Sequence, residues 1–344
     1  MVNAEPGCGE SQRSSVKASE SLVNVSVIIP TYNRADVLRK TLDAYGSQRG
    51  DHRLLEVLVV DDGSTDNTGA VVSDVKEAYA VRLRYLRQNN AGLAAARNHG
   101  IKEAEGELIL FGDDDIVPAA DMVSEHVTWH RRNPQTEVAI LGNVSWAREM
   151  RPTPFMMWSG NSGPQFNFAN FTPGSEIDFR YGYFCNTSVK TRFLLRSGVF
   201  DESFRTYGYE DVELSYRLAQ NGYRLLYNPS AVGYHYKFER FEDTKRRVEQ
   251  LYRSWPRFAR TEAGREFLRL WNANRQKPAG RTRRALKGLL RPVKAYVMPV
   301  VKPLLNTRVP LPGWLYGQVF YHYVMPFSEA IRVTDIPDES RWIA

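Results

Sequence analysis

Three adjacent carboxylates, Asp113, Asp114 and Asp115, stand out as residues that could do chemistry. They follow the apolar run GELILF (106–111) with no basic residue in between. Three neighbouring negative charges repel one another unless a cation or an array of N–H groups compensates them. Carboxylate oxygens suit Mg²⁺ and Mn²⁺, which often bind through one or two carboxylates together with substrate phosphates. The triplet therefore predicts either a divalent-metal site or a solvated turn.

A second acidic cluster begins at Asp61 and Asp62, directly after the apolar run LEVLVV (55–60). Asp and Asn at such positions can also cap the next helix or shape a turn. We expect that simpler role for Asp66 and Asn67, whereas for Asp61 and Asp62 a turn and a ligand-binding role are equally compatible with the sequence.

The elements that would position these acids alternate along the chain. Short, β-branched apolar runs predict buried strands, and amphipathic patterns between them predict helices. The expected strands cover 25–30, 55–60, 81–86 and 106–111, and the expected helices cover 35–45, 68–79 and 92–104. This order predicts an α/β fold with a mostly parallel sheet flanked by helices. Ligands bind outside the carboxyl ends of such strands, so both acidic clusters should lie on one edge.

Beyond residue 135 the pattern is less regular. We expect a strand at 137–146, a long loop at 151–180, a strand at 183–189 and a helix from Thr191. The segment 207–223 starts with acids and ends in Asn-Gly, which are helix start and stop signals. Residues 224–236 read as strand, turn and strand.

Composition and charge narrow the class of protein. The chain has 344 residues, of which 42% are hydrophobic and 25% charged, a globular composition. Cys8 and Cys185 lie far apart, which argues against a disulfide framework and favours a reducing, cytoplasmic location. No apolar run is long enough to span a bilayer. The polar residues 1–22 read as a disordered leader rather than a signal peptide.

The net charge of +7 is distributed unevenly. Between Glu266 and Glu329 there are eleven Lys and Arg residues and no acid, which leaves −4 for the remainder. Within this interval, residues 281–297 place apolar residues at helical spacing among basic ones. Such a segment could lie peripherally on an anionic membrane surface, or it could cap the preceding domain. No nucleic-acid-binding motif accompanies the charge, so we expect no nucleic acid.

Five motifs occur in an order that carries further meaning: PTYNR (30–34), VVDDGSTD (59–66), NNAGLAAARNHG (89–100), FGDDDIVP (111–118) and GYEDVELSYRLAQNGYRLLYNPSAVGYHY (208–236). Together they resemble the inverting family 2 glycosyltransferases, which have the GT-A fold. The resemblance implies a glycosyltransferase domain at 23–240, followed by a helical, basic extension at 241–344. It also implies a nucleotide-sugar donor, such as a UDP-sugar, a metal ion (Mn²⁺ or Mg²⁺), and a glycan or lipid-linked acceptor in polysaccharide, glycolipid or cell-surface glycan synthesis.

The resemblance also assigns residues to the nucleotide-sugar site. Pro30 and Tyr32 match the exit of the first strand, which shapes the nucleoside pocket. Asp62 matches the acid that accepts a hydrogen bond from a uracil-type N3–H. Asn90 and Arg97 match polar residues near the base and the phosphates, although a surface salt bridge is an alternative for Arg97.

The outer members of the Asp triplet match the family's Asp-x-Asp motif. By this resemblance Asp113 faces the ribose or the metal and Asp115 holds the metal that bridges the diphosphate. Asp114 is left to nucleotide-sugar binding or to the turn, because many relatives carry the motif one position differently. His235 matches a metal or phosphate contact of the family, and a structural histidine is the alternative.

Glu210 and Asp211 match the family's catalytic acid pair. Inversion requires a base on the acceptor side, and a carboxylate can serve as one. We expect Asp211 to be the base and Glu210 to orient it or bind acceptor. The simpler alternative is a pair of acids stabilised by a helix N-terminus.

Two other functions compete with sugar transfer. A sugar-phosphate nucleotidyltransferase also uses acids at strand ends and a metal, but it usually needs a Gly-rich, basic loop after the first strand. That position here is PTYNRAD, which contains no glycine. A non-catalytic nucleotide-sugar-binding protein would have no need of the complete acidic set.

Overall fold

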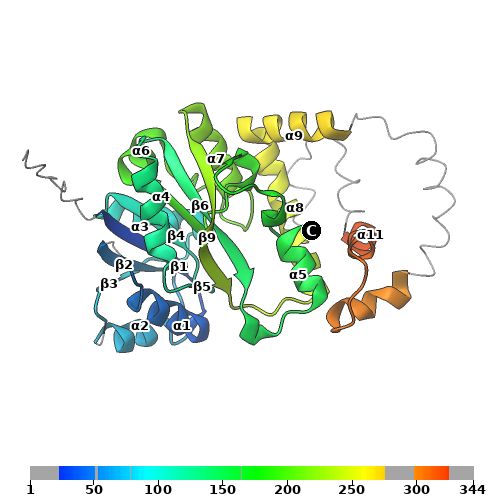
Figure 1. Ribbon diagram of the computed structural model, residues 1–344, viewed down its shortest axis with the longest axis horizontal. Helices are drawn as coiled ribbons and strands as arrows, with labels where there is room; N and C mark the ends of the chain where they lie inside the picture. The colour runs from blue at the N-terminus through cyan, green and yellow to red at the C-terminus, as the bar shows by residue number, and fades with distance from the viewer. Residues whose placement is uncertain (1–22, 51–52, 78, 164, 276–297, 325–344) are drawn as a thin grey trace, which may run out of the picture.

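The structure is a computed structural model that describes residues 23–50, 53–77, 79–163, 165–275 and 298–324 (Figure 1). Its centre is one sheet with the strand order β3-β2-β1-β4-β8-β6-β9-β5, and β7 pairs with β9. The strands are β1 (Asn24–Thr31), β2 (Arg53–Asp61), β3 (Arg82–Arg87), β4 (Leu108–Gly112), β5 (Ile116–Pro118), β6 (Val138–Trp146), β7 (Glu176–Ile177), β8 (Asn186–Lys190) and β9 (Arg224–His235).

Helices flank this sheet. They are α1 (Ala35–Gly46), α2 (Thr68–Lys76), α3 (Leu93–Glu103), α4 (Met122–Arg132), α5 (Pro154–Asn161), α6 (Thr191–Ser197), α7 (Glu210–Gln220), α8 (Phe241–Arg260), α9 (Glu262–Arg275) and α11 (Gly313–Val324). Short 3₁₀ helices are η1 (Arg148–Met150), η2 (Phe168–Asn170), η3 (Phe179–Tyr181) and η4 (Lys302–Asn306).

The strand directions confirm the predicted mostly parallel α/β fold. β1 runs parallel to β2 and β4, β2 runs parallel to β3, and β6 runs parallel to β9. Only β8, β5 and β7, among the described strands, pair antiparallel with their neighbours. The carboxyl ends of β1, β2 and β4 therefore meet at one edge, as the sequence predicted.

Alternating residues of β1 bury both faces of the sheet. Val27 and Ile29 pack with residues of α1 and α2, whereas Ile28 packs on the opposite face with residues of α3. Helix α3 lies so close to the sheet that a Cβ on Gly100 would come within 2.5 Å of Ile28 Cγ2. This close approach holds the middle of α3, which carries Arg97, against the sheet.

Two sequence predictions about local structure are wrong. The segment 151–180 is not one long loop, because it contains α5, η2, β7 and η3. Thr153 caps α5 by accepting a hydrogen bond from Met156 N at 3.2 Å, and Pro154 starts the helix, which are recognisable signals. Residues 224–235 form the continuous strand β9, in which the expected turn is a bulge where the pairing with β6 shifts.

The described part of the C-terminal extension packs against the domain. Figure 1 shows α8 and α9 on the side of the sheet remote from α1 and α2, with α11 beyond α5. Phe155 of α5, Phe241 of α8 and Tyr316 of α11 form a cluster with Val319, and the first two rings lie 5.6 Å apart. This contact favours the capping alternative for residues 298–324. The proposed leader at 1–22 and the basic helix at 281–297 lie outside the described residues.

None of the helices in the described ranges combines the length and apolar character needed to cross a bilayer. The boundary between a domain at 23–240 and an extension at 241–344 stays a prediction.

Candidate active site

A buried arginine joins two acidic segments that are far apart in the sequence. The Arg97 side chain is 2% exposed, and its guanidinium forms ion pairs with Asp211 at 2.5 Å and Asp113 at 3.2 Å. It also donates to the carbonyl oxygen of Phe184 at 3.3 Å and lies over the Phe200 ring. The alternative role that the sequence left open for Arg97, a surface salt bridge, is therefore wrong, because this side chain lies inside the protein between the two acidic segments.

The N-terminus of α7 fixes the acid pair. Glu210 is almost fully buried and accepts a hydrogen bond from Gly208 N at 2.9 Å. Asp211 accepts from Phe184 N at 3.2 Å, and 24% of its side chain remains exposed. Tyr209, just before the helix, has a positive φ of 70° and stacks on the Phe258 ring of α8. Packing on α8 thus holds the strained turn that presents Asp211.

The three aspartates after β4 have three different partners. Asp113 pairs with Arg97. Asp114 accepts from the Thr31 hydroxyl at 2.8 Å, and Arg34 Nε lies 3.7 Å from its other oxygen. Asp115 pairs with Arg34 and with His235 Nε2, the latter at 3.4 Å.

The mutual repulsion of the triplet is thus compensated by Arg97 on one side and by Arg34 and His235 on the other. Arg34 was absent from the predicted site. Its partner Asp115 is 81 positions away in the sequence, so no local signal connects the two residues.

The surroundings of the three aspartates shift their pKa values in different directions. Burial raises the pKa of Asp113 to about 6, with Asp115 and Asp211 adding to the shift and Arg97 opposing it. Burial also raises the pKa of Asp114, and Asp115 adds to that shift. The pKa of Asp115 is lowered, because the favourable contacts with His235 and Arg34 outweigh burial, which acts in the opposite direction. Asp115 is therefore the member of the triplet that stays charged most readily.

The pKa values of the acid pair are both raised. Burial is the main cause for Glu210, and the neighbouring Asp211 adds to it. Burial also raises the pKa of Asp211, whereas Arg97 and the Phe184 N–H oppose that increase. A carboxylate with a raised pKa and a partly open surface suits a general base.

His235 is held by three neighbours. Its ring stacks on Trp146 with centroids 4.9 Å apart and planes 9° from parallel. Gln165 Nε2 lies 3.3 Å from Nδ1, while Nε2 faces Asp115. The Oε1 atom of Gln165 is buried and has no hydrogen-bond partner among the described residues. Gln165 was not among the predicted site residues, since it lies in a segment that the sequence indicated as loop.

The acids after β2 organise the β3–α3 loop. Asp62 accepts hydrogen bonds from Gln88 Nε2 and Ala91 N at 2.8 Å and from Gly92 N at 2.9 Å. Asn90 is exposed and donates to the Asp62 carbonyl oxygen at 3.1 Å. Asp61 accepts from Ser64 N at 2.7 Å and from the Tyr85 hydroxyl, which fits a structural role.

The PTYNR segment lies beside this loop. Pro30 is buried in β1, whereas Tyr32 is 48% exposed at the strand exit. Asn33 Oδ1 accepts from Thr65 N at 2.8 Å, which ties the two loops together. Asp66 accepts from Thr68 N at 3.0 Å, as the predicted turn role requires.

Asp115 and His235 are the side chains that could hold a divalent metal. In the parts of the chain that the structure describes, no group of three His, Cys, Asp or Glu side chains is arranged to ligate an ion. A carboxylate and an imidazole at 3.4 Å nevertheless fit a site that is completed by water and by donor phosphates.

The chain is a transferase of the GT-A class. This class is assigned from the strand order, from the acids at the carboxyl ends of the strands, and from the two acidic segments that Arg97 joins. A model of glycosyl transferase family 2 matches residues 26–203, and the chain belongs to that family. Validoxylamine A glucosyltransferase of Streptomyces hygroscopicus subsp. jinggangensis (strain 5008) is 29% identical over 269 residues, which cover 69% of this chain and 60% of that protein. The chain thus spans less than two thirds of this relative.

Two solved structures share the fold. The mannosyltransferase PcManGT from Pyrobaculum calidifontis, in complex with GDP-Man and Mn²⁺, has a TM-score of 0.52 and 21% identity over 90% of this chain and 74% of that chain. The S. aureus TarS structure in complex with UDP-GlcNAc has a TM-score of 0.53 and 19% identity over 89% of this chain and 91% of that chain.

Proposed function

We propose that this chain is an inverting glycosyltransferase that moves a sugar from a nucleotide-diphosphosugar to an acceptor hydroxyl with the help of a divalent metal ion. The observation that carries the proposal is the buried Arg97 bridge, which joins Asp113 of the predicted donor side to Asp211 of the predicted acceptor side. Family membership supports the reaction class. UDP-sugars are our preferred donors, and a structure of TarS with UDP-GlcNAc supports that preference.

Asp211 is the proposed base, since it is the more accessible member of the acid pair. Its side chain is 24% exposed against 6% for Glu210. The ion pair with Arg97 keeps the Asp211 carboxylate oriented and favours its charged form, which can take the proton of the attacking hydroxyl. Glu210, enclosed and hydrogen-bonded to Gly208 N, orients the turn.

Asp115 and His235 are the proposed metal ligands, with Asp113 nearest to the ribose or the metal. A bound Mn²⁺ or Mg²⁺ would supply charge stabilisation for the departing diphosphate. The contact between Arg34 and Asp115 would have to open or rearrange to expose the carboxylate. Mn²⁺ in the related PcManGT complex supports this choice of cofactor.

Asp62, Asn90, Pro30 and Tyr32 are the proposed nucleoside side of the site. Three loop donors already converge on the Asp62 carboxylate, so the loop that would enclose a base is ordered around the residue that would bind it. Glycans and lipid-linked sugars remain the proposed acceptors. A cytoplasmic location rests on the two widely separated cysteines, and peripheral membrane contact rests on the basic composition of the extension.

A panel of nucleotide-sugars with and without Mn²⁺ tests the proposal by thermal shift, because a ligand that binds the native state raises Tm. We expect a shift that needs both a nucleotide and the metal, and NMR of the product should show an inverted anomeric centre. Pyrophosphate formed from a nucleoside triphosphate and a sugar phosphate would instead identify a nucleotidyltransferase.

A further inference from the structure

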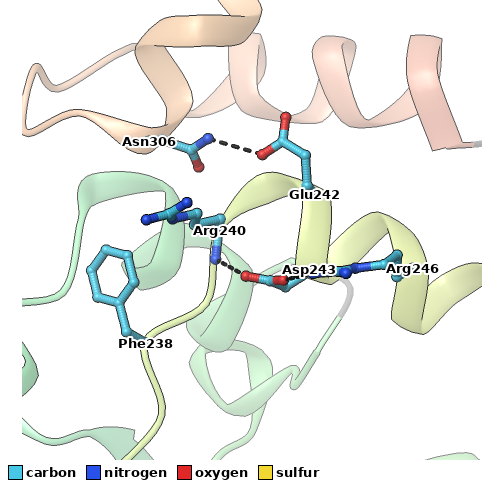
Figure 2. A pocket seen from close by; sticks show the side chains of 6 residues that line it. All are labelled: Phe238, Arg240, Glu242, Asp243, Arg246 and Asn306. Carbon is cyan, nitrogen blue, oxygen red and sulfur yellow. Dashed lines mark hydrogen bonds and ion pairs between the residues drawn. The ribbon is translucent and has the colours of Figure 1, made fainter.

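A cavity lies where the C-terminal extension meets the domain. It has a volume of about 750 Å³, within the range of small-molecule sites, and opens to solvent. Figure 2 shows the lining side chains, which come from the start of α8, the residues just before it, and the end of η4: Phe238, Arg240, Glu242, Asp243, Arg246 and Asn306.

The polar lining is held in place by its own hydrogen bonds. Asn306 accepts from Phe241 N and donates to Glu242, both at 2.9 Å, and so joins the extension to α8. Asp243 accepts from Arg240 N at 2.9 Å at the helix start. These bonds leave a preorganised set of planar polar groups around the cavity.

The cavity lining also contains equal numbers of positive and negative side chains and one exposed aromatic ring. Arg240 and Arg246 offset Glu242 and Asp243, so the lining carries no net charge, and Arg246 pairs with Asp243. Phe238 is 42% exposed, so its ring is accessible to a molecule in the cavity.

This chemistry fits a carbohydrate. A sugar ring presents C–H groups that can lie on an aromatic face, while its hydroxyls both donate and accept hydrogen bonds. Planar carboxylate, amide and guanidinium groups can contact two such hydroxyls at once. A polyanion would meet the two carboxylates of the lining and be repelled by them.

The cavity lies next to the proposed site of transfer. Phe238 follows His235 by three residues in the segment that runs from β9 to α8. On the other side, Arg247 pairs with Glu239 at 3.1 Å and interacts with Tyr207, close to the acid pair. One short segment therefore links the cavity to both the metal side and the base side.

We propose that this cavity is a carbohydrate-binding subsite that holds a sugar of the acceptor, with its ring on Phe238. The proposal rests on the proposed function and names a glycan as the acceptor class. It assigns the C-terminal extension a direct part in acceptor choice, because Asn306 completes the wall of the subsite.

The test uses the full chain on an array of immobilised neutral and uronic-acid-containing oligosaccharides, with UDP and Mn²⁺ present. Phe238→Leu keeps an apolar side chain but removes the ring, and we expect it to weaken glycan binding by about tenfold or more. Phe238→Trp should retain binding. Trp314→Leu is the matched control, since Trp314 is 69% exposed and lies outside the cavity lining.

Thermal stabilisation by UDP and Mn²⁺ is measured on every variant and should be unchanged. If the wild type shows that stabilisation but binds no glycan, or if Phe238→Leu binds as well as wild type, the subsite is refuted while the proposed function stands. Absence of metal-dependent stabilisation by every nucleotide-sugar of the panel would refute the proposed function. Sedimentation with phosphatidylglycerol vesicles that depends on Phe238 would overturn the carbohydrate assignment in favour of a lipid surface.

Discussion

Arg97 and Asp211 form a buried ion pair at 2.5 Å although they are separated by 114 positions in the sequence. The same guanidinium reaches Asp113, so one side chain orients both facing acids. Both contacts depend on the forked geometry of arginine, which lysine cannot reproduce.

Replacing Arg97 should therefore affect stability and activity together. We expect Arg97→Ala to lower the free energy of unfolding by about 3 kcal/mol, because it leaves two partly buried carboxylates unpaired. Arg97→Lys should keep more stability but lose transfer activity. Urea unfolding measures the first effect and product formation the second. Arg39→Ala removes an exposed pair with Asp74 at 2.9 Å and should cost at most about 1 kcal/mol. Equal effects of the two alanine variants would contradict the bridging role.

Substitutions of Asp211 and Glu210 should affect the transfer rate to different extents. We expect Asp211→Asn to reduce the transfer rate by about 10²–10⁴-fold while nucleotide-dependent stabilisation persists, because the base acts in the chemical step. Glu210→Gln should have the smaller effect on transfer, since Glu210 is enclosed and hydrogen-bonded to Gly208 N. Single-turnover rates on folded variants distinguish the two. A larger defect in Glu210→Gln would reverse the assignment.

Substitutions of Asp115 and Asp114 should differ in their effect on Mn²⁺-dependent stabilisation. We expect Asp115→Asn to abolish the Mn²⁺-dependent part of nucleotide stabilisation, whereas Asp114→Asn should reduce it less. Asp114 is already engaged by the Thr31 hydroxyl, whereas Asp115 faces His235. The check is a thermal shift with UDP at increasing Mn²⁺ concentration. A metal response that survives in Asp115→Asn would remove this residue from the ligand set.

Gln165 should act through His235. A metal on His235 Nε2 requires the proton to sit on Nδ1, where a flipped Gln165 amide could accept it with its unpartnered Oε1. Gln165→Leu should weaken Mn²⁺ binding by about 10–100-fold in titrations followed by electron paramagnetic resonance. Gln165→Glu keeps an acceptor and should bind Mn²⁺ well. Similar affinities in the Leu and Glu variants would show that the contact is only structural.

Two buried histidines should make the fold sensitive to acid. His126 and His130 of α4 lie within 2.9 Å of Asn186 and Ser188 of β8, and burial lowers the pKa of His126 to about 4. The folded state therefore binds fewer protons than the unfolded state between pH 6.5 and 4. Stability should fall as the pH falls through this window, by up to about 3 kcal/mol for His126.

Unfolding by urea at several pH values measures this slope. His126→Gln should be less stable at neutral pH, but its free energy of unfolding should change less between pH 6.5 and 4. An unchanged slope in this variant would show that other groups cause the acid sensitivity.

The sequence by itself determined the succession of strands and helices in the first half and the edge at which the acids gather. Apolar runs followed by Asp61–Asp62 and Asp113–Asp115 sufficed, because parallel strands with crossover helices bring their carboxyl ends together. The helix that starts at Glu210 was also predictable from its acidic start and its Asn-Gly end.

Only the tertiary structure decided which charges meet. Arg34 pairs with Asp115, and Gln165 contacts His235 from a segment that the sequence presented as loop. Helix α5 within that segment was missed although Thr153 and Pro154 signalled its start. Side-chain partners depend on the register of strands, on the bulge in β9 and on the packing of α8 against Tyr209, and these long-range contacts leave no periodic trace in the sequence.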